Sequence, residues 1–154
     1  MRRTSIAVLA LILLALSAYD LCAQNHGTGL GVILGEPTGI SFKQWLGGAT
    51  AIDAGLAWSF AADDVHFHMT YLIHAFDWIK STDDFGNRLN FYYGVGGRAR
   101  FERDSRAGGR GVIGLVYFFK GAPLDAFVEI APIMDVVPET DFNLNGGIGM
   151  RYFF

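Results

Sequence analysis

Apolar and polar side chains alternate along most of the chain after residue 26. Six long segments carry an uncharged, mostly apolar residue at every second position: Ile52 to Phe60, Val65 to Ala75, Tyr93 to Phe101, Ile113 to Phe119, Ala126 to Val136, and Ile148 to Phe154. Successive side chains of a β-strand point to opposite faces of the sheet, so this period of two predicts strands with one apolar face.

The opposite face of these strands carries ionic side chains, mixed with glycines such as Gly55, Gly94 and Gly149. Five cations on it stand against four carboxylates. The nine residues are Lys43, Arg98, Arg100, Arg110, Arg151, Asp53, Asp125, Glu129 and Asp135. Nearly balanced charges in a confined space pair with one another, because leaving one unpaired is costly. We therefore predict that these nine residues form a structural charge network in an enclosed interior.

Seven clusters of Gly, Pro, Asn, Asp and Ser divide the chain into eight segments, and these residue types supply the backbone angles of turns. The clusters lie at 35–39, 47–50, 61–64, 81–87, 104–109, 120–123 and 138–141. Each segment with its connection takes about 16 residues, which suits membrane strands of roughly 9–11 residues. The predicted fold is all-β, an eight-stranded antiparallel up-and-down transmembrane β-barrel over residues 24–154.

Two barrel types share this alternation and differ in which face is inside. A soluble barrel turns its apolar face inward, whereas a membrane barrel turns that face to lipid. The apolar face here is rich in aromatics, including Trp58, Tyr71, Tyr93 and Tyr117, and the ionic face is rich in glycine. Both features favour the membrane barrel. In hydrocarbon the strands must close into a ring, because a sheet edge would leave backbone groups unpaired. Side chains about fill the interior of an eight-stranded ring.

The first 23 residues have the pattern of a cleaved signal peptide. Arg2 and Arg3 precede an unbroken apolar run from Ile6 to Leu16, which is too short to span a bilayer as a helix. Ala23 is the expected last residue before cleavage. The alternative is a lipoprotein acylated at Cys22, the only cysteine, although Leu21 before it fits that signal poorly. The domain boundaries are then 1–23 for the signal peptide and 24–154 for the barrel.

Composition excludes some functions. The net charge of −3 gives no broad basic field for nucleic acid. No motif calls for a cofactor, and we expect none. Cleavage after Ala23 would leave a chain without cysteine, and hence without disulfides.

The chain ends in residues 146–154 with apolar side chains at alternate positions, and Phe154 is the last residue given. These positions are Ile148, Met150, Tyr152 and Phe154. This segment resembles the terminal strand by which bacterial outer-membrane barrels are recognised for assembly. The resemblance implies the barrel-assembly machinery as a partner. The alternative is the buried last strand of a secreted β-domain.

Residues 27–154 resemble the small outer-membrane barrels of the OmpA transmembrane, OmpX and OmpW kind. Gly35–Gly39, Gly96–Phe101 and Glu129–Pro132 are similar to segments of a branch known only as a domain of unknown function. The resemblance implies export to the bacterial outer membrane, contact with its lipids and a monomeric state. With an even number of strands, both chain ends would face the periplasm. The expected outer connections are short, the longest from Glu102 to Gly109, unlike the long loops of OmpA.

Two groups on the polar face suggest ligand sites. His66, His68 and His74 share that face, and side chains two apart on a strand can chelate a metal. No cysteine or carboxylate nearby completes such a site, so polar lining is the favoured interpretation. Arg98, Arg100 and Arg110 suggest an anion site. Pairing with Glu129 and Asp135 inside the barrel is favoured over it.

Two further groups suggest other chemistry. Ser59, His68 and Glu129 are the nearest candidates for the Ser–His–acid arrangement of a lipid-modifying barrel enzyme. No local motif joins them, and we expect no enzymatic activity. Asp83, Asp84 and Asn87 lack the alternating oxygen ligands of a calcium loop, so they are expected to form a polar periplasmic turn.

The leading functional hypothesis is a plugged structural or surface-interaction barrel with a salt-bridged lumen. The alternative is a narrow, OmpW-like channel for small or apolar solutes, suggested by the glycine-rich strands and by inward Leu72, Phe118 and Phe127. A lipid-modifying enzyme is the third candidate.

Overall fold

The computed structural model describes residues 26–36, 38–59, 64–79, 81–101 and 105–154. The predicted signal peptide, with Cys22, lies outside the described residues. No helix in the described part of the chain has the length and apolarity needed to span a bilayer.

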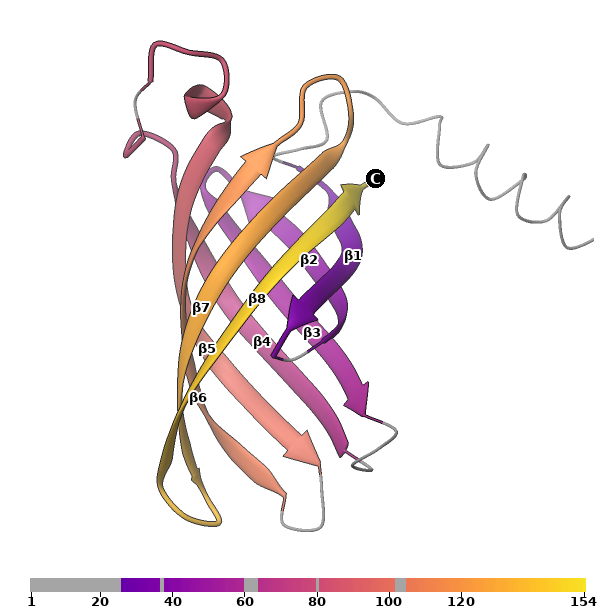
Figure 1. Ribbon diagram of the computed structural model, residues 1–154, viewed down its shortest axis with the longest axis vertical. Helices are drawn as coiled ribbons and strands as arrows, with labels where there is room; N and C mark the ends of the chain where they lie inside the picture. Colours follow the sequence, from indigo (N-terminus) through magenta and orange to yellow (C-terminus); the bar gives the residue numbers. More distant parts are fainter. Residues whose placement is uncertain (1–25, 37, 60–63, 80, 102–104) are drawn as a thin grey trace, which may run out of the picture.

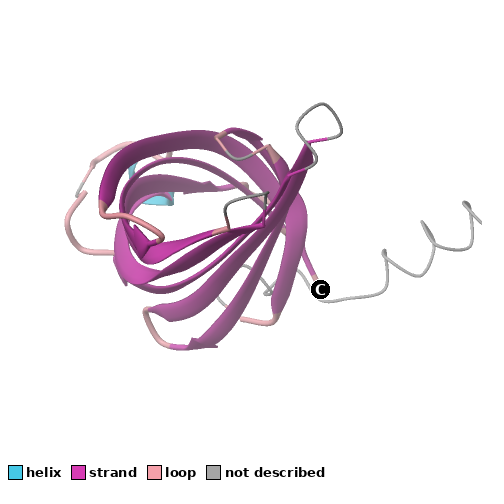
Figure 2. Cartoon of the chain, turned by 90° about the horizontal axis from the view of Figure 1, so that it is seen from below, coloured by secondary structure: helices cyan, strands magenta, loops and turns pink. Residues whose placement is uncertain are grey.

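The described chain forms eight antiparallel strands joined in sequence order into a closed barrel (Figures 1 and 2). The strands are β1 (Thr28–Gly35), β2 (Gly39–Gly47), β3 (Thr50–Ser59), β4 (Asp64–Ala75), β5 (Leu89–Phe101), β6 (Arg106–Phe118), β7 (Leu124–Val137) and β8 (Asp141–Phe153), with a 3-10 helix η2 (Gly86–Arg88) between β4 and β5. β8 pairs with β1 and closes the ring. The predicted eight-stranded up-and-down topology is confirmed.

The barrel has two unlike ends. The start of β1 and the end of β8 lie together at the top of Figure 1, with the long connection that contains η2, and we call this the terminus end. The opposite end, called the far end, holds the connections after β1, β3, β5 and β7.

The predicted turn at 104–109 is too long. β6 begins at Arg106, and Arg106 to Gly109 pair with Arg100 to Gly97 of β5. The two glycines of this segment suggested a turn, but Gly108 instead allows β6 to approach β7. A Cβ at Gly108 would collide with the backbone of Met134. Glycine inside a strand marks such a close approach.

The predicted facing of the side chains is confirmed. The apolar set points outward, so that Val95 is 71% exposed and Ile148 is 60% exposed. The ionic set points inward, where Lys43 and Asp125 are 0% exposed and Arg151 is 1% exposed. Inward Leu72, Phe118 and Phe127 are also buried. The barrel is therefore apolar outside and ionic within.

Candidate functional site: the barrel lumen

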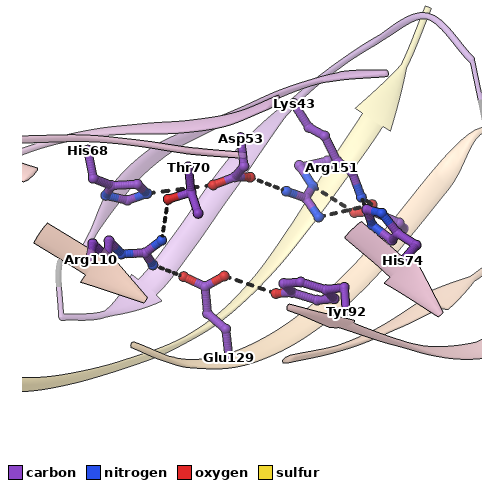
Figure 3. Close-up of polar contacts among 10 residues, drawn as sticks. Lys43, Asp53, His68, Thr70, His74, Tyr92, Arg110, Glu129 and Arg151 are labelled. Carbon is purple, nitrogen blue, oxygen red and sulfur yellow. Dashed lines mark hydrogen bonds and ion pairs between the residues drawn. The ribbon is translucent and has the colours of Figure 1, made fainter. Parts of the chain in front are cut away.

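A buried ion cluster joins β8, β7 and β3 in the lumen, nearer to the terminus end than to the far end (Figure 3). The Arg151 guanidinium donates two hydrogen bonds to Asp125, from Nε to Oδ1 at 3.0 Å and from Nη2 to Oδ2 at 3.1 Å. Its Nη1 donates to Asp53 Oδ2 at 2.6 Å. One arginine thus bridges two carboxylates, in the forked geometry that makes guanidinium–carboxylate pairs strong.

Strand register places the members of this cluster. Arg151 and Asp125 are directly opposite on β8 and β7, and Lys43 and Asp53 are directly opposite on β2 and β3. The lumen then brings the two cross-strand pairs together, since Lys43 Nζ lies 3.8 Å from Asp125 Oδ2. The cluster holds two cations and two carboxylates. We call Lys43, Asp53, Asp125 and Arg151 the central cluster.

A second polar group lies beside the central cluster. Arg110 pairs with Glu129 and donates from Nη1 to Thr70 Oγ1 at 2.7 Å. Tyr92 donates its hydroxyl to the other oxygen of Glu129 at 2.9 Å. His68 Nε2 lies 3.6 Å from Asp53 Oδ1 of the central cluster (Figure 3).

Glycines make room for the ring side chains that cross the lumen. A Cβ at Gly114 would collide with the ring of Tyr92, and one at Gly149 would collide with the ring of Phe127. The Phe127 ring lies 4.0 Å from the Arg151 guanidinium carbon. Each glycine leaves a space on its own strand, and the ring of a residue on the neighbouring strand fills that space.

Aromatic rings cover the central cluster on its terminus side. The Trp45 ring lies 4.4 Å from that of His74, 6.3 Å from Phe76 and 6.4 Å from Phe118. Lys43 Nζ lies over the Trp45 ring at 4.4 Å and 2.9 Å from His74 Nε2. The ammonium group therefore lies among the Trp45 ring, His74 and the Asp125 carboxylate.

The lumen opens toward the far end. A cavity of about 450 Å³ lies there, lined by side chains of β3, β4, β5, β6 and β8 and by the turn after β1. We call it the vestibule. Its wall includes Arg98, which forms a two-bond ion pair with Asp135. Beyond it, toward the middle, a cavity of only about 10 Å³ touches Arg110 and His68. That space holds one water molecule at most.

The structure separates the nine predicted network residues into four places. The central cluster holds four of them, and the pairs Arg110–Glu129 and Arg98–Asp135 hold four more. Arg100 lines the vestibule. The favoured pairing of Arg98 and Arg110 with Asp135 and Glu129 therefore occurs.

Sequence reasoning missed two participants, the Tyr92 hydroxyl and the Trp45–His74 contact. Alternation pointed to Tyr92, because its neighbour Tyr93 belongs to the outward set. The same alternation places Trp45 on the inward face, because it lies two positions after the inward Lys43. Neither residue type identified a partner, since the contacts join strands far apart in the sequence.

The residues considered for other chemistry have separate surroundings. Among the described residues, no group of three or more His, Cys, Asp or Glu side chains is placed to hold a metal ion. His68 contacts Asp53, and Glu129 contacts Arg110 and Tyr92. The side chain of Ser59 lies outside the described part of the structure. Asp84, in the long connection, lies 3.5 Å from Arg88 and 3.7 Å from Lys120.

The outer surface has aromatic pairs around the terminus end. Trp78 stacks on Phe91 at 5.1 Å, and Phe85 on Tyr117 at 5.0 Å. Ile148, Met150, Tyr152 and Phe154, the predicted assembly residues, point outward on or just after β8, and the rings of the last two are 5.4 Å apart. Rings of this kind form girdles at the membrane–water interface of outer-membrane barrels.

Comparison with known proteins gives a structural relative and no sequence relative. No protein-family model matches the chain, and no match was found among curated proteins. The crystal structure of the N-terminal β-barrel domain of Pseudomonas aeruginosa OprF superimposes with a TM-score of 0.57. The fold is similar to that barrel. The match covers 86% of this chain and 99% of the other, at 14% sequence identity.

Proposed function

We propose that this protein is an integral barrel of the bacterial outer membrane, whose lumen is closed by its own side chains and whose role is structural or surface-interacting. One observation supports it most: large apolar side chains face outward while paired charges are buried within. Every strand contributes to the outer surface, through Val32, Leu46, Leu56, Met69, Val95, Ile113, Ile130 and Leu144. Apolar surface on all sides is unfavourable in water and favourable in lipid.

The fold supports the same proposal through its backbone. A closed ring leaves no sheet edge, so the ladder hydrogen bonds are satisfied between strands. In the proposed orientation both termini face the periplasm, and the far end faces outside. The signal peptide at 1–23 directs export, and the assembly machinery recognises the last strand. The folded barrel is a monomer surrounded by outer-membrane lipids.

Electrophoresis of the mature chain tests the membrane barrel. After detergent extraction, the unboiled protein is expected to migrate differently from the boiled protein, because a folded barrel resists the detergent. The chain should also remain with outer-membrane vesicles after a carbonate wash. A mature chain that is monomeric and freely soluble without detergent would contradict the proposal.

Recordings in planar bilayers test the closed lumen. The central cluster, the Arg110–Glu129 pair and the aromatic rings occupy the middle of the ring, so conductance should be absent or very small. Large, steady single-channel steps would instead support the alternative, a narrow channel for small solutes. The vestibule is the observation that favours this alternative, because it already opens part of the lumen.

The proposal assigns no catalytic role to the lumen. It is supported by the contacts of His68 with Asp53 and of Glu129 with Arg110, which engage both residues in the charge network. Membrane lipids of a deletion strain should match those of the parent strain. A lipid species that changes on deletion and returns with the gene would contradict this part.

A further inference from the structure

The last strand extends beyond the strand that closes the ring. β1 has 8 residues and β8 has 13. Their pairing ends where Gly35 is opposite Gly147, and the N–H of Glu36 then donates to the Gly146 carbonyl at 2.9 Å. Residues 141–145 of β8 continue toward the far end, paired with β7 on one side. Among the described residues no strand lies on their other side, and Figure 1 shows β1 ending well short of the turn after β7. We call this side of residues 141–145 the free edge of β8.

The backbone groups at the free edge follow from alternation along the strand. In an antiparallel sheet, successive residues turn their N–H and C=O groups to opposite neighbours. Gly146 bonds on the β1 side, and Phe154 does the same by donating its N–H to the Thr28 carbonyl at 2.9 Å. The even-numbered residues Phe142 and Leu144 therefore direct their N–H and C=O groups to the free edge, which lacks a described partner strand.

The side chains at the free edge are apolar and open to the outside. Phe142 is 67% exposed and Leu144 is 63% exposed. Lysine and proline commonly protect an exposed strand edge from other chains, and residues 141–145 contain neither. The free edge thus combines unpaired backbone groups with exposed apolar side chains, which is the combination that pairs with a further strand.

The free edge lies at the outer margin of the membrane in the proposed orientation. At about 3.3 Å per residue and a tilt of about 40°, the 8 residues of β1 span roughly 20 Å of an apolar band about 25 Å tall. The ring is therefore closed through most of the band and has an edge only near its outer limit. Hydrocarbon cannot satisfy the free backbone groups, and water does not favour the exposed Phe142 and Leu144. An added strand with apolar side chains satisfies both requirements.

A second copy of the barrel does not fit the free edge within one membrane. Two identical edges related by a twofold axis pair as antiparallel strands, and this places one barrel upside down relative to the other. Copies inserted in one membrane share a single orientation. The fitting occupant is therefore a strand of a different polypeptide.

We propose that the free edge of β8 binds an extended segment of another protein as an added strand, antiparallel to β8 and in line with β1. Its residues opposite Phe142 and Leu144 are apolar, because directly opposite side chains share one face of a sheet. The residues between them are polar and lie on the face of Asn143 and Asn145. Main-chain hydrogen bonds supply the affinity in this mode of recognition. The inference deepens the surface-interacting role and rests on the proposed function, which places the far end outside.

Amide hydrogen exchange of the detergent-folded barrel, followed by NMR, tests the free edge. The amides of Phe142 and Leu144 should exchange fast, and those of Asn143 and Asn145, which face β7, should exchange slowly. The probe is the synthetic peptide Lys-Thr-Val-Thr-Val-Thr-Lys, whose central residues favour strands. Occupation of about nine edges in ten should slow exchange at Phe142 and Leu144 about tenfold. Exchange at Asn143 and Asn145 should not change.

Two methylated peptides separate backbone pairing from side-chain contact. The valines should lie opposite Phe142 and Leu144, so their N–H groups point at β8 and those of the threonines point away. N-methylation of the valines should abolish the protection, and N-methylation of the threonines should preserve it. Equal protection by the two methylated peptides would overturn the proposal.

Two substitutions of one residue form a matched pair. Leu144→Pro deletes the N–H at the free edge and should weaken peptide binding about tenfold, the effect of one lost hydrogen bond. Leu144→Ala keeps that N–H and should still protect the amide of Phe142. Migration of unboiled samples shows whether each variant is folded. The methylated peptides test the proposal on the parent protein if Leu144→Pro does not fold.

The remaining outcomes separate this inference from the barrel proposal. A barrel that migrates differently unboiled and boiled, but shows no protection at millimolar peptide, would overturn the added strand and leave the membrane barrel standing. Slow exchange at Phe142 and Leu144 before peptide is added would show that the edge is already paired, and would also overturn it. A dimer of the parent that Leu144→Pro abolishes would assign the edge to a second copy instead. Identical migration with and without boiling would count against the barrel itself.

Discussion

The closed middle of the lumen, from the central cluster to the Arg110–Glu129 pair, and its far end use the same residue types to opposite effect. In the middle, Arg151 is enclosed by Asp125 and Asp53, and each cation has a carboxylate within the ring. At the far end, Arg100 stands opposite another arginine, beside a cavity of about 450 Å³. Arginine is thus an enclosed structural bridge in the first region and part of a cavity wall in the second. The neighbours on adjacent strands decide which.

The largest effect is expected from removing the bridge in the middle. Arg151→Met keeps much of the side-chain volume but leaves Asp125 and Asp53 facing each other without their shared cation. Breaking one side of a buried ion pair costs about 3–5 kcal/mol. Unfolding by guanidinium chloride in lipid vesicles should show this loss as a lower free energy of unfolding. Adding Asp125→Asn and Asp53→Asn to Arg151→Met should restore part of it. If the Arg151→Met variant were as stable as the parent, the central cluster would not stabilise the barrel.

Much of this division follows from the sequence, and part of it does not. Alternation within each strand put Arg151 inside and Tyr152 outside, because a strand's two faces are fixed by its own residues. It did not show that Arg151 meets Asp53, which lies 98 positions away on β3. That contact depends on how the eight strands are shifted relative to one another around the ring. The pattern along a single strand does not predict those shifts. The vestibule was missed for the same reason, since side chains from at least five strands define it.

A smaller effect is expected from adding volume to the middle. Gly114→Ala places a methyl group against the Tyr92 ring, and overpacking of this kind costs about 1–3 kcal/mol. Gly109→Ala, on the same strand, is the control, because nothing lies within 4 Å of a Cβ there. The unfolding midpoint should fall for Gly114→Ala alone. Equal midpoints would mean that Tyr92 moves aside freely and that the interior is loosely packed.

Removal of one hydroxyl in the middle should cost less again. Tyr92→Phe keeps the ring but deletes the donor to Glu129 Oε2, a hydrogen bond worth about 1.5 kcal/mol. Glu129 keeps its pair with Arg110, so the carboxylate remains compensated. Equilibrium unfolding of this variant, of Arg110→Met and of the double variant would measure the coupling of the two contacts to Glu129. A coupling of zero would mean that the two contacts act independently.

The smallest effect is expected at the far end, and it sharpens the contrast most. Arg106 and Asp141 form an ion pair at 3.3 Å with both side chains well exposed, and exposed pairs contribute about 0–1 kcal/mol. Arg106→Gln loses that contribution but also ends the repulsion from Arg100, so its free energy of unfolding should stay within about 0.5 kcal/mol of the parent. Unfolding at low and high salt checks the sign. If repulsion dominates, the variant should be the more stable of the two at low salt, and the difference should shrink as salt screens the arginines. A loss as large as that of Arg151→Met would show that the far end is held by buried charge like the middle, and the distinction between the two regions would fail.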